Sequence, residues 1–304
     1  MMPSSLIISR EQQHTGGDQA RGLRALVARQ AISAGIGTSP AGGCHSIVVS
    51  GGKGGAGRSV IALNLAVVLA QRGCTVGLLD VSPDLGNIEL LCGLNGYWNL
   101  SHVMQGCREL NDVVLAGPAG VNILSGASCL ADAGGEKSPR RRQVFDQLQA
   151  FEQKLDWLIV DASGGASALT REFAQSADDS LIVATPEPTG VAEAYASVKS
   201  LAASGRSRLG LLVNQADSEL QAQQILDRLQ QAAHAFLHVD LHRRGYIPRD
   251  SVIPTSVNER IPFVLQAPQS AAAMALLRLA QRWTRPNPPD GVTSFFSRLR
   301  RFEK

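Results

Sequence analysis

Residues 46–59 read Ser46-Ile-Val-Val-Ser50-Gly-Gly-Lys-Gly-Gly-Ala-Gly57-Arg58-Ser59. The apolar run at the start is typical of a buried strand, and the apolar stretch that begins at Ser59 predicts a helix. Glycines between them let the backbone approach an anion, and the first amide groups of a helix carry positive potential. This order of strand, turn and helix predicts a phosphate-binding loop rather than a glycine-rich turn without a ligand. The residues expected to line the loop are Gly52, Lys53, Gly54, Gly55, Ala56, Gly57, Arg58, Ser59 and Val60.

Strand and helix patterns alternate along the chain on either side of this loop. Near-continuous apolar strands joined by helices indicate a mainly parallel sheet covered on both faces, which is a doubly wound α/β fold. Ligands bind at the carboxyl ends of the strands in such a sheet. The predicted strands are 46–50, 75–80, 121–125, 157–161, 180–185, 209–214 and 245–248, and the predicted helices are 59–72, 140–154, 168–176, 190–204, 218–237 and 269–283.

The composition excludes several function classes. The 304 residues are 44% hydrophobic and 18% charged, which excludes disorder over most of the chain. A net charge of +3 and 5% aromatic residues give no support for nucleic-acid binding, so a run such as 140–142 is read as a solvated helix start. Five cysteines without a C-x-x-C pair predict neither a disulfide framework nor a zinc site. No apolar run is long enough for a transmembrane helix or a signal peptide, so we expect a cytoplasmic location.

Composition also divides the chain into segments. Residues 1–17 are polar and expected to be flexible. Residues 18–32 predict a helix, and 33–43 read as a linker. We expect the nucleotide-binding domain over 44–285, followed by a proline-rich break at 286–291 and an amphipathic helix at 292–304.

Two polar side chains are placed to hold Mg²⁺ beside the loop. Ser59 occupies the serine or threonine position that ligates magnesium in such loops, and Asp161 ends an apolar strand, as the magnesium carboxylate does. Arg58 stands where the common pattern has lysine. Arginine is larger and fork-shaped, so the exchange is not conservative, although a guanidinium also binds phosphate.

The loop sequence K-G-G-x-G, with its early Lys53, resembles the deviant Walker A motif of the MinD/ParA ATPases. That resemblance implies an ATP-sandwiched homodimer in which Lys53 contacts the partner's nucleotide. Within this class the chain is most similar to the flagellar number regulators of the FlhG/FleN (YlxH-like) family. Segment 79–94 aligns with the switch I stretch of that family, and 185–189 matches its T-P-E-P-T element.

The resemblance assigns roles to particular residues. It implies catalytic roles for Lys53 and Asp80, and magnesium binding by Ser59, Asp80 and Asp161. Asn214 matches the base-recognition asparagine, and Pro248 lies in the element I-P-R-D, which matches I-P-Y-D. ATP and Mg²⁺ are the implied cofactors.

One departure from the family concerns hydrolysis. Ser82 stands where the family has the aspartate that positions water, and Asp84, two residues later, is the candidate replacement. A serine does not orient water as a carboxylate does, and such a loss typically lowers the rate by about 10²–10⁴-fold. Slow or absent hydrolysis is therefore an alternative to a working ATPase.

The N-terminal segment 18–32 resembles the D-Q-A-x-x-L-R element of the flagellar regulators. In that family the element activates the signal-recognition-type GTPase FlhF. A helix that docks on its own domain is the alternative. The residues carried over as partner-binding are Asp18, Gln19, Ala20, Leu23 and Arg24.

The tail 292–304 combines an apolar face with cations. This pattern favours binding to an anionic membrane surface, and it resembles the family's membrane-targeting helix. The alternative is an ordinary terminal helix that packs back on the domain. The expected membrane residues are Val292, Phe295, Phe296, Leu299 and Phe302.

These observations together predict an ATP-dependent dimerising switch that regulates flagellum number and placement. The resemblance implies as partners FlhF, flagellar basal-body or regulator proteins and the inner membrane surface, with no direct nucleic acid. We expect the chain in the cytoplasm and, reversibly, at the membrane near the cell pole or flagellar site. Two alternatives stay open: a nucleotide-binding scaffold without hydrolysis, and a positioning ATPase for other cargo.

Overall fold

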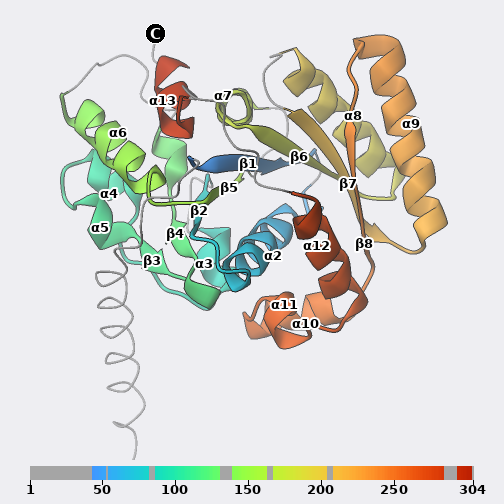
Figure 1. Ribbon diagram of the computed structural model, residues 1–304, viewed down its shortest axis with the longest axis horizontal. Coiled ribbons are helices and arrows are strands. Elements are labelled where there is room, and N and C mark those ends of the chain that lie inside the picture. Colours follow the sequence, from blue (N-terminus) through green and yellow to red (C-terminus); the bar gives the residue numbers. More distant parts are fainter. Residues whose placement is uncertain are drawn as a thin grey trace, which may run out of the picture. The chain divides into compact units, whose positions relative to one another are not determined.

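The computed structural model describes residues 43–52, 54–81, 86–130, 139–162, 167–203, 208–283 and 293–302. They form an eight-stranded sheet with the order β3-β4-β2-β5-β1-β6-β7-β8 (Figure 1). All pairs are parallel except β3 with β4. The strands are β1 (His45–Ser50), β2 (Val76–Asp80), β3 (Leu115–Ala116), β4 (Asn122–Leu124), β5 (Trp157–Asp161), β6 (Asp179–Ala184), β7 (Arg208–Ala216) and β8 (His242–Pro248).

Helices cover both faces of this sheet, which confirms the predicted doubly wound α/β fold (Figure 1). One face carries α6 (Pro139–Glu152), α7 (Ala168–Ser176), α8 (Pro188–Ala202) and α9 (Glu219–Leu237). The other face carries α2 (Arg58–Gln71), α11 (Phe263–Gln266) and α12 (Ala271–Arg282), with α10 (Val252–Glu259) next to α11. Each layer has its own apolar core, because the central strands β1, β5 and β6 are buried on both sides.

Several short elements lie between β2 and β5. They are α3 (Asn87–Leu91), α4 (Leu100–Met104) and α5 (Leu110–Val113), with single turns of 3₁₀ helix at Pro118–Gly120 and Ala127–Leu130. Sequence periodicity did not predict these helices or β3, because none is long enough to show a clear period. Asn99 and His102 form a capping box at the start of α4. These local hydrogen bonds stabilise a helix that is too short to show a hydrophobic period.

The polar residue that interrupts the apolar run of α2 has a structural role. Asn64 is buried, and its Nδ2 donates to the Val60 carbonyl at 2.8 Å. Its Oδ1 accepts from the Val264 amide at 3.1 Å, which ties α11 to α2. The two hydrogen bonds offset the cost of burying this amide, and the bond to Val264 fixes the position of α11.

The C-terminal segment docks on the first face as α13 (Phe295–Leu299), followed by a 3₁₀ turn at Arg300–Phe302. α13 lies against α6 and α7 (Figure 1), and its Phe295 and Phe296 side chains are fully buried. The sequence predicts either a tail that binds a membrane or a terminal helix that packs on the domain. In this structure α13 packs on the domain.

Candidate functional site

The glycine-rich loop joins β1 to α2 at the carboxyl ends of the strands (Figure 1). β1 lies at the centre of the sheet, with β5 on one side and β6 on the other. The chain first leaves β1 toward β2 and β4 and later continues from β6 toward β8, so the loop stands where the winding direction reverses. Ligands of open α/β sheets bind at this point.

The glycines of the loop fall into two groups. Gly51, Gly52 and Gly57 are closely packed, because an added Cβ would lie 2.6 Å from the Val183 carbonyl oxygen, 2.2 Å from the Glu193 Cβ and 2.5 Å from the Asn214 Nδ2 respectively. Gly54 and Gly55 face open space on the other side. Gly55 and Gly57 both have φ of 82°, which favours glycine. The loop is therefore packed against the protein on one side and open on the other.

The start of α2 presents free amide groups. Its N-cap is Gly57, no described side chain caps the helix, and the first turn holds no acidic residue. Uncapped amides at a helix N-terminus attract an anion. Ser59 and Val60 lie in this first turn, both half-buried.

Two amide side chains of β7 hold the loop from behind. The Nδ2 of Asn214 donates to the Ala56 carbonyl at 2.8 Å, and the Nε2 of Gln215 donates to the Gly55 carbonyl at 3.1 Å. Gln215 has φ of 61° and stands at a register shift between β7 and β8, which turns its side chain toward the loop. Asn214 is buried, and its Oδ1 has no partner among the described residues. The sequence singled out Asn214 for base recognition, and the structure places it under the loop.

Two predicted magnesium residues lie on neighbouring strands. Asp80 ends β2 and Asp161 ends β5, and the register pairs these two residues directly. Both are fully buried. The Oδ2 of Asp80 accepts a hydrogen bond from the Ile88 amide at 3.1 Å, which joins β2 to the start of α3.

Burial and the charge of Asp80 raise the pKa of Asp161 to about 7, while the Ser59 hydroxyl and Arg58 act in the opposite direction. Neither carboxylate oxygen of Asp161 has a hydrogen-bond partner of standard geometry among the described residues. A buried, unpaired carboxylate next to a second acid is costly without a cation.

Arg58 does not reach into the open side of the loop. Its guanidinium donates from Nη1 to the Gly51 carbonyl at the base of the loop. Burial lowers the pKa of Arg58, and the nearby carboxylates of Asp161 and Glu193 partly offset this effect.

The residues present fit a magnesium nucleotide. The loop offers an open glycine side and an uncapped helix start, and Asp161 offers a buried carboxylate beside Ser59. Lys53, Ser82 and Asp84 were also predicted to act here, and they lie outside the described residues. Pro248 ends β8 and is half-buried. Among the described residues no group of three or more histidine, cysteine or acidic side chains is arranged to hold a metal on its own.

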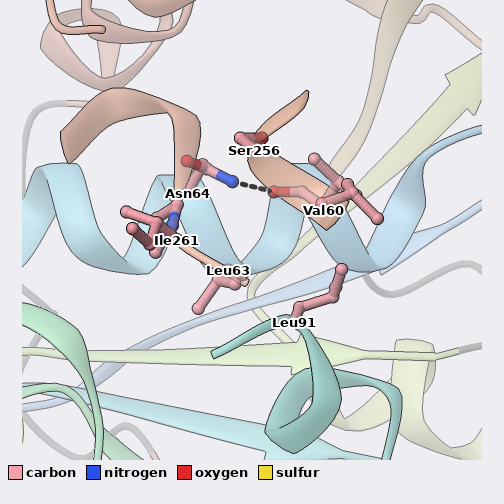
Figure 2. Close-up of a pocket in the computed structure, with 8 residues that line it drawn as sticks. Val60, Leu63, Asn64, Leu91, Ser256 and Ile261 are labelled. Carbon is pink, nitrogen blue, oxygen red and sulfur yellow. Dashed lines mark hydrogen bonds between the residues drawn. The ribbon is translucent and has the colours of Figure 1, made fainter. Parts of the chain in front are cut away.

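A small hollow lies elsewhere along α2. Figure 2 shows it between α2, α3 and the segment that joins α10 to α11. No charged side chain lines it, and its two polar side chains, Asn64 and Ser256, form hydrogen bonds within the protein. Its lining residues are Val60, Leu63, Asn64, Leu91, Ser256, Val257, Ile261 and Pro262.

The structure places the predicted membrane face in the protein interior. Phe295, Phe296 and Leu299 are buried, and the first two donate their amides to the Glu152 carboxylate at 2.7 and 3.1 Å. Val292 lies outside the described residues, and Phe302 lies in the terminal 3₁₀ turn. The predicted partner-binding residues 18–24 also lie outside the described part. No helix of the described chain is long and apolar enough to cross a membrane.

Two residues of the site and one that anchors the tail could not be predicted from the sequence. Gln215 follows the asparagine that was singled out, and Glu193 lies in the helix that starts in the T-P-E-P-T element. Glu152 anchors the tail from a position 143 residues away in sequence. Only Glu193 had a signal, because it lies close to the T-P-E-P-T element at 185–189, and that signal did not indicate its neighbours.

Comparison with known proteins identifies the family of this chain. A model of the ParA family, described as NUBPL iron-transfer P-loop NTPase, matches residues 44–284. The chain belongs to the ParA family of P-loop NTPases. Among relatives of this ParA-family chain, the antiactivator FleN of Pseudomonas aeruginosa is 33% identical over 254 residues, which cover 82% of this chain and 91% of FleN. The flagellum site-determining protein YlxH of Helicobacter pylori is 28% identical over 84% of this chain and 90% of its own.

Solved structures share the same fold. The septum site-determining protein MinD of Pyrococcus horikoshii, in complex with Mg-ADP, matches with a TM-score of 0.63 and 22% identity over 79% of this chain and 95% of its own. MinD in the MinC:MinD complex of Aquifex aeolicus also has a TM-score of 0.63, at 19% identity over 83% of this chain and 100% of its own. These findings confirm the ParA/MinD fold and the resemblance to FleN and YlxH.

Proposed function

We propose that this ParA-family chain is an ATP-dependent dimerising switch that regulates flagellum number and placement. The observation that carries the proposal is the similarity to FleN, which extends over 82% of the chain at 33% identity. The similarity to YlxH supports the same assignment. The site supports nucleotide binding, because an open glycine loop stands beside the adjacent carboxylates of Asp80 and Asp161.

Each residue of the site has a defined task in this proposal. The amides of the loop and of the first turn of α2 bind the phosphates, and Ser59, Asp80 and Asp161 hold Mg²⁺ directly or through water. Asn214 and Gln215 keep the loop in shape by binding its carbonyl groups. Mg-ATP would supply a phosphoryl group with its charge partly neutralised. Lys53 reaches the partner's nucleotide, and Asp84 orients water in place of the missing aspartate at Ser82.

A scaffold that binds nucleotide without hydrolysis is the second candidate. Ser82 lacks the carboxylate for orienting water, and Arg58 is held at Gly51 instead of the open side of the loop. In that case function would come from partner binding alone.

ATP binding and hydrolysis, measured side by side with and without anionic liposomes, test the proposal and separate these candidates. We expect saturable Mg-ATP binding by the wild type and slow turnover that is lost in Lys53→Ala. Turnover that appears only in Ser82→Asp would favour the scaffold. No saturable binding in Mg²⁺ buffer would contradict both.

Two finer parts of the proposal concern partners. We propose that the tail binds the inner membrane and that residues 18–24 activate an FlhF-type GTPase. Because the tail is docked in this structure, membrane binding requires α13 to leave its place between α6 and α7. We expect the intact protein to pellet with anionic liposomes and a variant lacking 292–304 to stay in solution. An Asp18→Ala/Gln19→Ala double variant that stimulates the GTPase normally would contradict the second part.

A further inference from the structure

A cluster of three arginines lies at the corner of the sheet where β7 and β8 begin. Arg208 is the first residue of β7, Arg244 lies near the start of β8, and Arg282 is the last residue of α12. The guanidinium of Arg244 lies over the Trp283 ring, 4.6 Å from its centroid, and Arg282 donates from Nη1 to the Arg244 carbonyl at 3.5 Å. β8 is the last strand of the sheet, so this corner lies at the periphery of the sheet (Figure 1).

A single buried carboxylate accepts hydrogen bonds within the arginine cluster of the described chain. Asp179, at the start of β6, accepts from Arg208 and from Arg244 at 3.0 Å each, and it also contacts His45 at 2.7 Å. Arg282 forms no ion pair with an acid of the described residues and is exposed. The side chain of Arg208 is 52% exposed despite its ion pair. Three guanidinium groups therefore share one carboxylate, and the cluster keeps a positive charge at the surface.

Two further ion pairs flank the cluster. Arg243 of β8 contacts Asp227 of α9 at 2.7 Å, and Asp240 contacts His234 at 3.1 Å. The first pair fastens the start of β8 to α9. Both pairs balance their own charges, so they leave the positive charge of the arginine cluster in place.

An exposed aromatic ring belongs to the same corner. α9 ends at Leu237, and residues 238–241 lead directly into β8. Phe236, one residue before the end of α9, is 77% exposed. A large apolar ring displayed beside cations is typical of surfaces that enter the interface of an anionic membrane.

The chain also leaves the domain toward its tail at this corner. The contact of Arg282 with the Arg244 carbonyl places the end of α12 beside the start of β8. Segment 284–292, which leads to the proposed membrane-binding tail, therefore begins next to the arginine cluster. A segment of this length spans at most about 30 Å, so a membrane bound by the tail would lie close to the cluster.

We propose that this surface, the β8 corner formed by Arg208, Arg244, Arg282 and Phe236, is a second contact with an anionic membrane. The inference rests on the proposed membrane binding by the tail and adds a surface of the folded domain to it. The guanidinium groups bind lipid phosphates, and the ring of Phe236 enters the interface. Each contact alone is weak, but the tail keeps the corner near the membrane and so raises its effective concentration.

Co-sedimentation of the full-length chain with vesicles tests this, using phosphatidylglycerol mixed with phosphatidylcholine, and phosphatidylcholine alone. Arg282→Gln is expected to weaken binding to the anionic vesicles by about threefold to fivefold, the effect of one cation near the membrane surface. Phe236→Ala is expected to weaken it as well, and the double variant more than either. Added salt should remove the effect of Arg282→Gln and leave that of Phe236→Ala, because salt screens only the charge.

Two control variants isolate the position and the sign of the charge. Arg142→Gln removes an exposed cation from the first turn of α6, whose other end leads into the start of β5, and it should bind vesicles like the wild type. Asp240→Asn removes an exposed negative charge beside the corner and should tighten binding to the anionic vesicles. A thermal unfolding scan checks that all variants are folded.

The outcomes separate this inference from the proposed function. If Arg282→Gln and Phe236→Ala both bind anionic vesicles as Arg142→Gln does, the β8 corner is not a membrane contact, and binding by the tail stands. If these variants lose binding to a double-stranded DNA fragment while vesicle binding is unchanged, the corner binds nucleic acid and the inference is overturned. If the wild type does not bind anionic vesicles at all, the proposed membrane binding is wrong and the role of the corner falls with it.

Discussion

Asp161 is the residue of the site whose negative charge is unfavourable in the folded chain. It is fully buried, pairs in register with Asp80, and has a pKa raised to about 7 by burial and by Asp80. An aspartate in the unfolded chain has a pKa of about 3.9. Between these values the folded chain keeps a proton that the unfolded chain has lost, so the free energy of unfolding falls as the pH rises from about 4 to about 7.

Asp161→Asn should therefore stabilise the nucleotide-free chain. At pH 8 we expect the variant to exceed the wild type by about 1–3 kcal/mol in free energy of unfolding, because the buried charge is gone. The difference should shrink toward zero near pH 4, where the wild-type carboxyl is protonated. Urea unfolding at several pH values measures this.

The control for Asp161→Asn is an exposed carboxylate. Asp217 accepts a hydrogen bond from Arg249, which lowers its pKa. We expect Asp217→Asn to be no more stable than the wild type at any pH. A gain for Asp161→Asn that does not depend on pH would contradict the electrostatic account.

Asn214 offers a second test at a single side chain. Asn214→Ala removes the hydrogen bond to the Ala56 carbonyl and should cost about 1 kcal/mol of stability. It should also weaken Mg-ATP binding, because the loop loses its support. Gln215→Ala removes a more exposed hydrogen bond and is expected to have a smaller effect on both quantities. Equal effects of the two variants would indicate that the loop does not depend on the buried contact.

The docked tail shows how distant residues combine to place one short element. Glu152 accepts two amides from the start of α13, and Arg298 contacts the Ser176 carbonyl and forms an ion pair with Asp178 at 2.9 Å. Asp178 lies near His45 at the amino-terminal edge of the sheet, opposite the loop. A helix of five residues is not stable alone, so these contacts and the buried phenylalanines determine its position.

Disrupting the tail should destabilise the domain. Phe296→Ala removes a fully buried ring and is expected to cost about 3–5 kcal/mol, and Glu152→Ala leaves two amides without an acceptor at a cost of about 1–3 kcal/mol. Arg301→Ala, at an exposed position, is the control and should change little. Denaturant unfolding measures all three. A Phe296→Ala variant as stable as Arg301→Ala would show that the tail is not docked in solution.

The elements that could be predicted from the sequence are those with long local patterns. The strand before Gly51, the helix after Gly57 and the alternation of the central elements were all predicted, because apolar periodicity and glycine punctuation are visible within one segment. The short helices between β2 and β5 have no such pattern. The docking of the tail depends on Glu152 and Asp178, which nothing in segment 292–304 indicates.

In the candidate site, too, local motifs could be predicted from the sequence and contacts between distant segments could not. Motif spacing assigned Ser59 and Asp161 to one site, and the structure brings them together because the carboxyl ends of parallel strands meet at one edge. The direction of the Arg58 side chain was not predictable, since the residue type does not indicate that the guanidinium binds the Gly51 carbonyl instead of facing the open side of the loop. Residue type indicates the chemistry that is available, whereas packing decides which partner each group meets.

The arrangement of the complete domain explains why one loop could control association. The loop, α2 and the ends of β2 and β5 all meet at one edge of the sheet, so a nucleotide bound there would lie beside these elements. Lys53 is assigned to the nucleotide of a second copy. The nucleotide would then belong to both subunits, and dimerisation would depend on its γ-phosphate.

Sedimentation velocity of the full-length chain with Mg-ATP, with Mg-ADP and without nucleotide tests this claim most directly. Lys53→Ala and Ser82→Asp complete the set. The account predicts a dimer for the wild type only with Mg-ATP, and a monomer for Lys53→Ala under every condition. A wild type that stays monomeric while saturated with Mg-ATP, or one that dimerises equally without nucleotide, would contradict the claim that this chain is a nucleotide-controlled switch.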